Sequence, residues 1–98
     1  MPWYSFVCEV CGYKAMCSGG PDSGFIIRTA TIHCLGCKDL YDVEVGPAFG
    51  PGSTDPVPRE IPCPEVPGHR TVLWVGGDPC PQCSEPLLRP DQPCGYWD

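Results

Sequence analysis

The hydrophobic positions of this chain fall into short clusters that predict β-strands rather than helices. Residues 3–7 and 25–32 are rich in aromatic and β-branched side chains, the composition of strands. Apolar and acidic residues alternate over 40–45, which is the period of a half-buried strand. Residues 71–75 predict a further strand, and residues 18–24 are typical of a turn between strands. The sequence therefore indicates a small all-β fold.

The composition leaves little material for a conventional hydrophobic core. The chain of 98 residues contains 14 prolines, 12 glycines and 9 cysteines. Ordering each residue costs about 1–2 kcal/mol of backbone entropy. Domains this small usually need disulfides or a bound metal to offset that cost, so the fold is expected to be stapled in one of these two ways.

The expected compartment favours metal over disulfides. Residues 1–4 carry no basic segment that leads into an apolar stretch, so we expect no secretory signal. No apolar run approaches the roughly 20 residues needed to span a bilayer. We therefore expect a cytoplasmic protein without membrane contact, and structural disulfides are rare in the cytoplasm. Disulfides remain the alternative to metal.

Six of the cysteines form close pairs of the Cys-x-x-Cys type, here called knuckles. Two intervening residues let both sulfurs face a single ion, and a following glycine closes the turn with a positive φ. Gly12 follows the first pair, whereas Gly36 stands inside the second. We predict a first metal site from the first two pairs, namely Cys8, Cys11, Cys34 and Cys37.

Residues 4–45 resemble a zinc ribbon, the family in which two knuckles clamp one zinc ion at the end of a small antiparallel sheet. The resemblance implies structural zinc but little about function, because zinc ribbons occur in transcription factors, ribosomal proteins and accessory subunits of enzymes. Residues 4–13 also resemble the start of a rubredoxin, which implies iron held by four cysteines and electron transfer. Rubredoxins usually carry Cys-Pro-x-Cys-Gly as their second knuckle, and residues 34–38 depart from that pattern.

A second metal site is expected in the C-terminal part, around the knuckle Cys80-Pro81-Gln82-Cys83. Its remaining ligands are predicted to be Cys63 and His69, which gives three sulfurs and one nitrogen. Cys94 can replace His69 in this set. A further alternative is that this half holds no metal and that Cys80 and Cys83 form a free dithiol.

The chain is predicted to contain two modules in sequence. A zinc ribbon is expected over 1–45, a linker rich in proline and glycine over 46–60, and a second, diverged zinc-ribbon-like module over 61–98. In a cross-braced arrangement, as in RING-type domains, the first and third cysteine pairs would share one ion. The long proline-rich stretch between Cys37 and Cys63 favours two sequential sites instead.

Charge and motifs limit the possible functions. The net charge is −6 and the lysines and arginines are scattered, which disfavours a nucleic-acid-binding ribbon. The sequence contains no phosphate loop, no nucleophile-base signature and no His-Glu-x-x-His motif. We therefore expect a non-catalytic protein with two zinc ions, acting as an adaptor or as an accessory subunit of a larger enzyme through contacts with another protein. A rubredoxin-like iron electron carrier is the alternative.

The residues outside the two predicted sites have simpler expected roles. Cys17 is expected to be a small core residue, and His33 to point away from the metal ligands. Trp3 and Tyr4 are expected to pack on their own sheet. Tyr and Trp are enriched at protein interfaces, and residues 95–98 follow a proline-rich stretch. We therefore predict that this tail, with Tyr96 and Trp97, docks on a partner protein or on a second copy.

Overall fold

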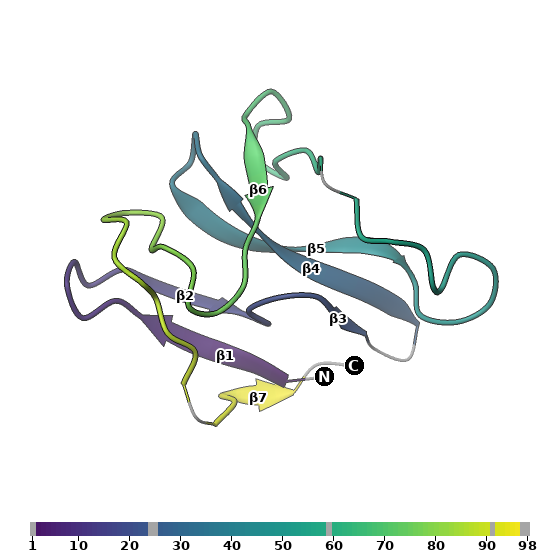
Figure 1. The fold of residues 1–98 in the computed structure, drawn as a ribbon, viewed down its shortest axis with the longest axis horizontal. Coiled ribbons are helices and arrows are strands. Elements are labelled where there is room, and N and C mark those ends of the chain that lie inside the picture. The colour runs from purple at the N-terminus through teal and green to yellow at the C-terminus, as the bar shows by residue number, and fades with distance from the viewer. Residues whose placement is uncertain (1, 24–25, 59, 91, 97–98) are drawn as a thin grey trace.

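Strands, turns and irregular segments make up the chain that the computed structural model describes, which is residues 2–23, 26–58, 60–90 and 92–96. Within these residues there is no helix of the length and apolar character that crossing a membrane requires. The predicted all-β fold is confirmed, and Figure 1 shows its strands. These are β1 (Pro2–Val7), β2 (Lys14–Cys17), β3 (Asp22–Ser23), β4 (Ile27–Cys34), β5 (Asp39–Pro47), β6 (Thr71–Leu73) and β7 (Gly95–Tyr96).

The smaller sheet has the strand order β2-β1-β7. β1 pairs with β2 in antiparallel register, and on its other edge it pairs with the C-terminal strand, with Trp3 opposite Gly95. Gly95 allows a close approach here, because a Cβ at this position would lie 2.6 Å from the Trp3 ring. The backbone of residues 95–96 therefore belongs to the protein's own sheet, which the sequence did not suggest. Trp97 lies outside the described residues.

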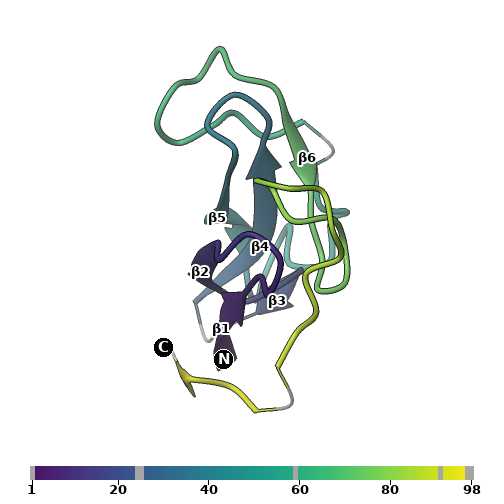
Figure 2. The same cartoon turned by 90° about the vertical axis from the view of Figure 1, so that its left-hand side faces the viewer.

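The larger sheet is built around β4, which pairs with three other strands. β5 runs along one side of β4, while β3 and β6 pair with different parts of its other side. Figure 2 shows β5 and β6 on opposite sides of β4. β6 lies in the predicted C-terminal module and β4 in the predicted N-terminal one, so strand pairing joins the two parts of the chain.

The hydrophobic core joins the smaller sheet to the C-terminal part of the chain. Phe6 is fully buried, and its ring meets the ring of Trp74 edge to face with 5.2 Å between the centroids. The indole N–H of Trp74 donates to the carbonyl oxygen of Pro79 at 2.9 Å. Leu87, Leu40 and Cys17 belong to the same core, so the prediction that Cys17 is a core residue is confirmed. Cys8 and Cys80 are buried and belong to the same core.

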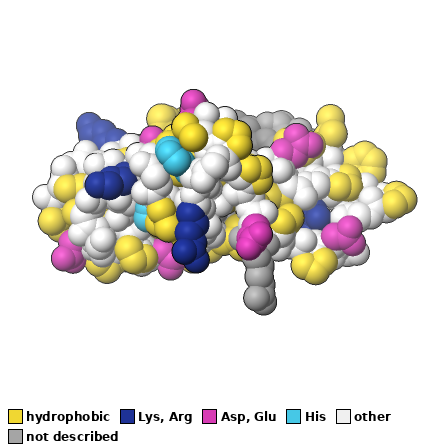
Figure 3. Space-filling model, turned by 90° about the horizontal axis from the view of Figure 1, so that it is seen from above, with side chains coloured by type: hydrophobic (Ala, Val, Ile, Leu, Met, Phe, Trp, Pro, Cys, Tyr) yellow, Lys and Arg dark blue, Asp and Glu magenta, His cyan; other side chains and the backbone are white. Residues whose placement is uncertain are grey.

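The stretch predicted as a linker is ordered by one arginine. The guanidinium group of Arg28 donates to three carbonyl oxygens of this stretch, those of Pro47 at 3.0 Å, Asp55 at 2.9 Å and Gly52 at 3.1 Å. Three bonds from one rigid planar group fix the path of a segment whose prolines and glycines allow little regular structure. This stretch lies at the right-hand end of the molecule in Figure 1, and Figure 3 shows hydrophobic side chains at the same end.

The core assignment predicts a strong contrast between two phenylalanines. Phe6→Ala should lower the free energy of unfolding of the metal-loaded protein by about 3–5 kcal/mol, because it leaves a cavity beside Trp74. Phe49, which is 70% exposed, is the matched control, and Phe49→Ala should change that free energy by less than about 0.5 kcal/mol. Urea unfolding measures both, and comparable losses in the two variants would contradict this core.

Candidate metal centres

Eight side chains converge into two groups of four, and each group can hold a metal ion. Within each group, all the ligand atoms lie within 4.8 Å of one another. The four-cysteine cluster consists of Cys8, Cys11, Cys80 and Cys83. The histidine cluster consists of Cys34, Cys37, Cys63 and His69.

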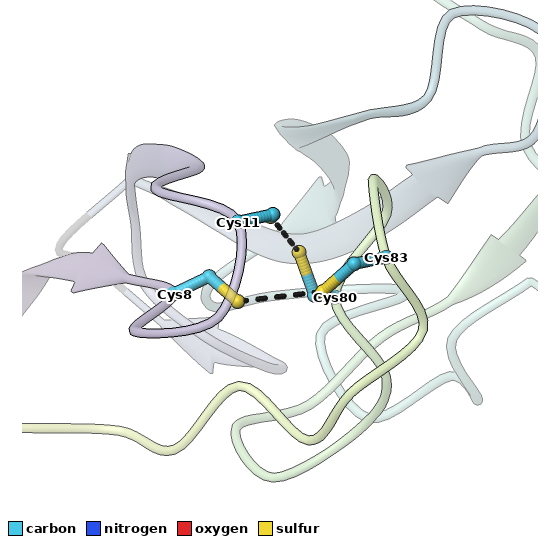
Figure 4. Close-up of side chains that lie close together, drawn as sticks. All are labelled: Cys8, Cys11, Cys80 and Cys83. Atoms are coloured by element: carbon cyan, nitrogen blue, oxygen red, sulfur yellow. Dashed lines mark hydrogen bonds between the residues drawn. The ribbon is translucent and has the colours of Figure 1, made fainter.

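The four-cysteine cluster has the spacing of a tetrahedral metal site. The Sγ atoms of Cys8 and Cys83 are 3.5 Å apart, and those of Cys11 and Cys80 are 3.7 Å apart. Figure 4 shows the two knuckle loops facing each other across these contacts. Four sulfurs bound to zinc at 2.3 Å would be about 3.8 Å apart, whereas a disulfide would require about 2 Å. The donors therefore fit a shared ion, and all four thiols are free.

The histidine cluster fits a metal ion equally well. The Nδ1 atom of His69 is 3.5 Å from the Sγ of Cys34 and 3.4 Å from the Sγ of Cys37. The Sγ atoms of Cys37 and Cys63 are 3.7 Å apart. A tetrahedral zinc ion would place a nitrogen and a sulfur ligand about 3.6 Å apart. His69 thus faces the thiols through Nδ1, with its other ring nitrogen directed away from them.

The predicted grouping of the knuckles is wrong. One expected site consisted of Cys8, Cys11, Cys34 and Cys37, and the other of Cys63, His69, Cys80 and Cys83. The structure instead pairs the first knuckle with the third. It pairs the second knuckle with the segment from Cys63 to His69. This is the cross-braced arrangement, in which the first and third cysteine pairs share one site.

Strand pairing and core packing explain why the knuckles are grouped in this way. Cys34 lies opposite Thr71 in the β4–β6 register, which brings His69 to the end of β4. β5 carries the chain away from Cys37 over its whole length, so a long return is needed before Cys63 can lie beside Cys37. The stretch rich in proline and glycine supplies this return. Beyond β6, packing in the core with Trp74 and Leu87 leads the chain to the first knuckle.

Cys94 and His33 lie outside both clusters. Cys94, the alternative to His69, is exposed, and its backbone N–H bonds the carbonyl oxygen of Trp3. His33 lies in β4 between its partners Leu40 and Val72. Burial lowers the pKa of His33, which favours the neutral ring in this position.

The three knuckles share one local geometry even though only one of them has the expected glycine. The residue after each second cysteine has a positive φ, which is 80° at Gly12, 55° at Lys38 and 69° at Ser84. Its N–H donates to the carbonyl oxygen of the first cysteine at 2.9 Å in every knuckle. Lysine and serine are strained in this region, and the turn hydrogen bonds, together with the clustering of the thiols, hold them there.

Gly36 has a different role from the one that its place in the motif suggested. A Cβ at this position would lie 2.5 Å from Cγ of the His69 ring and 2.6 Å from Nδ1. Only glycine therefore lets the ring lie against the second knuckle and bring Nδ1 to the thiols. In the sequence, this contact is indicated by the position of the glycine, which stands between the two cysteines and not after them.

Not all thiols of the four-cysteine cluster can ionise without a compensating positive charge. The N–H of Cys11 lowers the pKa of Cys8 to about 7. The N–H of Glu85 acts in the same direction on Cys83, but burial and the neighbouring thiols outweigh it and raise the pKa of Cys83 to about 12. A divalent cation removes this conflict, because it attracts all four thiolates at once.

The histidine cluster shows the same division between its thiols. Burial opposes ionisation of Cys63, but the N–H groups of Val66 and Glu65 outweigh it and lower the pKa to about 7. The Tyr41 hydroxyl lowers the pKa of Cys37, whereas burial and the adjacent thiols raise it to about 11. This cluster therefore also combines one easily ionised thiol with one whose ionisation a bound cation would favour.

Two side chains connect the clusters directly. The amide of Gln82, within the third knuckle, donates from Nε2 to the carbonyl oxygen of Lys38 at 2.7 Å. The hydroxyl of Tyr13 donates to the carboxylate of Asp39 and accepts the N–H of Leu40 at 3.0 Å. Burial, together with the Asp39 bond, raises the pKa of Tyr13, so the hydroxyl keeps its proton at neutral pH. All three bonds reach from the neighbourhood of the four-cysteine cluster to the end of the second knuckle and the start of β5.

Comparison with known proteins adds no family to this geometry. No protein-family model matches the chain, and neither does any curated protein or solved structure. What can be said of the function therefore rests on the chain's own residues.

The contact between Gly36 and His69 predicts a specific weakening of one metal centre. Gly36→Ala should lower metal affinity at the histidine cluster by about 10–100-fold, the size of effect seen when a ligand's support is lost. Gly68→Ala is the matched control, because a Cβ at Gly68 meets no atom within 4 Å. Cobalt titration reports the two centres separately through their different ligand sets. Equal affinities in the two variants would contradict the placement of His69.

The bonds between the clusters predict that loading one centre helps the other. The double variant Gln82→Ala/Tyr13→Phe keeps all eight candidate ligands, and we expect it to lose about 1–3 kcal/mol of coupling between the two binding steps. Cobalt titration should then show the two centres filling independently. Gln92→Ala changes an exposed glutamine away from both clusters and should keep the coupling. Independent filling in the unmodified protein would show that the bonds transmit nothing.

Proposed function

We propose that this protein is a zinc-stabilised adaptor, in which two structural zinc ions hold a protein-binding surface in shape. The observation that carries the proposal is that each cluster supplies four protein donors at tetrahedral spacing. Four protein ligands fill the coordination of a structural zinc ion, whereas a catalytic zinc ion keeps one position for water or substrate. The knuckles have the ligand pattern of a zinc ribbon, and the reducing cytoplasm suits their free thiols.

Exposed apolar side chains support the protein-binding part of the proposal. Val10, at the tip of the first knuckle, is 69% exposed, and Leu88, just after the third knuckle, is 73% exposed. Single exposed hydrophobic residues are ordinary, but these two lie beside one metal cluster and share a groove. An accessory subunit or adaptor uses such positions to contact its partner. The net charge of −6 disfavours a nucleic acid in that role.

A rubredoxin-like electron carrier is the second candidate, and one observation favours it. The structure joins the first knuckle to Cys80-Pro81-Gln82-Cys83, so the partner knuckle has the Cys-Pro-x-Cys pattern that residues 34–38 lack. Ser84 stands where a rubredoxin usually has glycine, at a φ of 69°. Tetrahedral sulfur ligands accept iron as well as zinc, so the bound metal distinguishes the two functions.

Metal content is the first test of the proposal. Protein purified without added metal should be colourless, contain two zinc ions per chain and lose its structure when a chelator removes them. Structural zinc supplies about 10–16 kcal/mol of apparent binding free energy in zinc-finger peptides at neutral pH, which this small core cannot replace. Elemental analysis with a visible spectrum decides, and a red protein with iron in the four-cysteine cluster would support the electron carrier instead.

The adaptor role is tested by the metal dependence of association. The zinc-loaded chain, used as bait in its own cells, should retain a partner that rebinds as a purified protein. Cys80→Ser, which removes one ligand of the four-cysteine cluster, should abolish this retention. Phe49→Ser, at a distant exposed site, should preserve it. Rebinding of the partner that is equal for the zinc-loaded and the chelated chain would contradict the proposal.

A further inference from the structure

A small groove lies between the first knuckle and the segment that follows the third. Its volume is about 240 Å³. Its apolar lining comes from Val7, Val10, Pro86 and Leu88, and its charged lining from Glu9 and Glu85. The exposure of the three aliphatic side chains is high, at 48% for Val7, 69% for Val10 and 73% for Leu88. An opening bordered by exposed aliphatic side chains is where a partner's apolar side chain would gain most from burial.

The four-cysteine cluster links the two walls of this groove. One wall belongs to the first knuckle, around Cys8, and the other begins two residues after Cys83. These two cysteines are 75 positions apart in the chain, and their Sγ atoms are 3.5 Å apart. A metal ion bound between them therefore holds the two walls together. The backbone N–H of Cys80 bonds the carbonyl oxygen of Glu85 at 2.7 Å, which ties the start of the second wall to the third knuckle.

Charge indicates what the groove accepts. Both ionisable carboxylates in its lining, Glu9 and Glu85, are exposed, and a divalent ion with four thiolates adds a net charge of about −2 next to them. Of the nearby cations, Arg89 stacks over the Tyr4 ring at 5.1 Å, and Lys14 lies opposite Val7 on β2. Neither cation lines the groove. An apolar pocket with an acidic rim is complementary to an apolar side chain that has basic neighbours.

We propose that this groove docks a segment of a partner protein in which a large apolar side chain stands next to lysine or arginine. The proposal rests on the adaptor function and specifies its contact surface. The apolar side chain enters between Val10 and Leu88, and the basic residues face Glu9 and Glu85. A second copy of the chain is a poorer occupant, because its net charge of −6 would oppose the acidic rim.

A peptide titration followed by NMR tests the groove directly on the zinc-loaded full chain. The probe is a short synthetic peptide with one leucine between lysines. Two matched peptides replace the lysines with glutamates or the leucine with serine. The leucine-lysine peptide should shift the amide signals of Val10 and Leu88 in a saturable manner. Both matched peptides should bind about tenfold more weakly or worse.

Variants of the protein separate the apolar contribution from the charge contribution. Val10→Ser/Leu88→Ser should weaken the leucine-lysine peptide about tenfold, while Phe49→Ser should leave its affinity unchanged. Glu9→Gln/Glu85→Gln should weaken it and flatten its salt dependence. Each variant is checked for two zinc ions per chain before titration, so that loss of binding at full metal content is attributed to the groove.

Four results would overturn the proposal. They are equal binding of the glutamate peptide, amide shifts confined to the Phe49 loop, self-association through Val10 and Leu88 without peptide, and no saturable binding by protein that holds two zinc ions. None of these would by itself contradict the adaptor function, which depends on metal-dependent retention of the native partner. If that partner is retained equally by Val10→Ser/Leu88→Ser, the adaptor function stands and the groove assignment is wrong.

Discussion

The fold depends on bringing together thiols that are far apart in the sequence. Cys8 and Cys83 are separated by 75 positions, and Cys37 and Cys63 by 26. Closing loops of this length costs entropy. The core centred on Phe6 and Trp74 is small and offsets only part of that cost. Thiols packed 3.5–3.7 Å apart resist joint ionisation, so a bound cation turns a repulsive cluster into the cross-link. The pairing of β6 with β4 and of β7 with β1 likewise joins the C-terminal part of the chain to the N-terminal part.

Cross-bracing makes both parts of the chain depend on the same two clusters. Because each cluster takes ligands from both parts of the chain, loss of either ion would release segments on both sides of the molecule. The hydrogen bonds of Gln82 and Tyr13 join the surroundings of the two clusters, and the predicted coupling would pass through them. The groove between Val10 and Leu88 has walls from two segments that the four-cysteine cluster brings together, and Leu87 and Phe6 pack in the same core beside it. On the proposed function, a binding surface assembled in this way would be present when metal is bound and absent when it is removed.

Local features of the fold could be predicted from the sequence, whereas the pairing of its parts could not. Strand periodicity located β1, β4, β5 and β6, and cysteine spacing indicated the knuckles. The short strand β2 was missed because Lys14–Cys17 becomes a strand only through its pairing with β1. The ligand grouping was missed because it is set by the β4–β6 register and by the packing of Trp74, which are contacts distant in sequence. Positive φ at Lys38 and Ser84 likewise had no local signal.

The cross-braced pairing is tested most directly by determining which cysteines share an ion. The protein is loaded with an NMR-active cadmium isotope in place of its metal, and each cadmium signal is correlated with the Hβ protons of the cysteines bound to it. The account predicts one cadmium joined to Cys8, Cys11, Cys80 and Cys83, and another joined to Cys34, Cys37 and Cys63 and to the ring of His69. A single cadmium joined to Cys8, Cys11, Cys34 and Cys37 would contradict it.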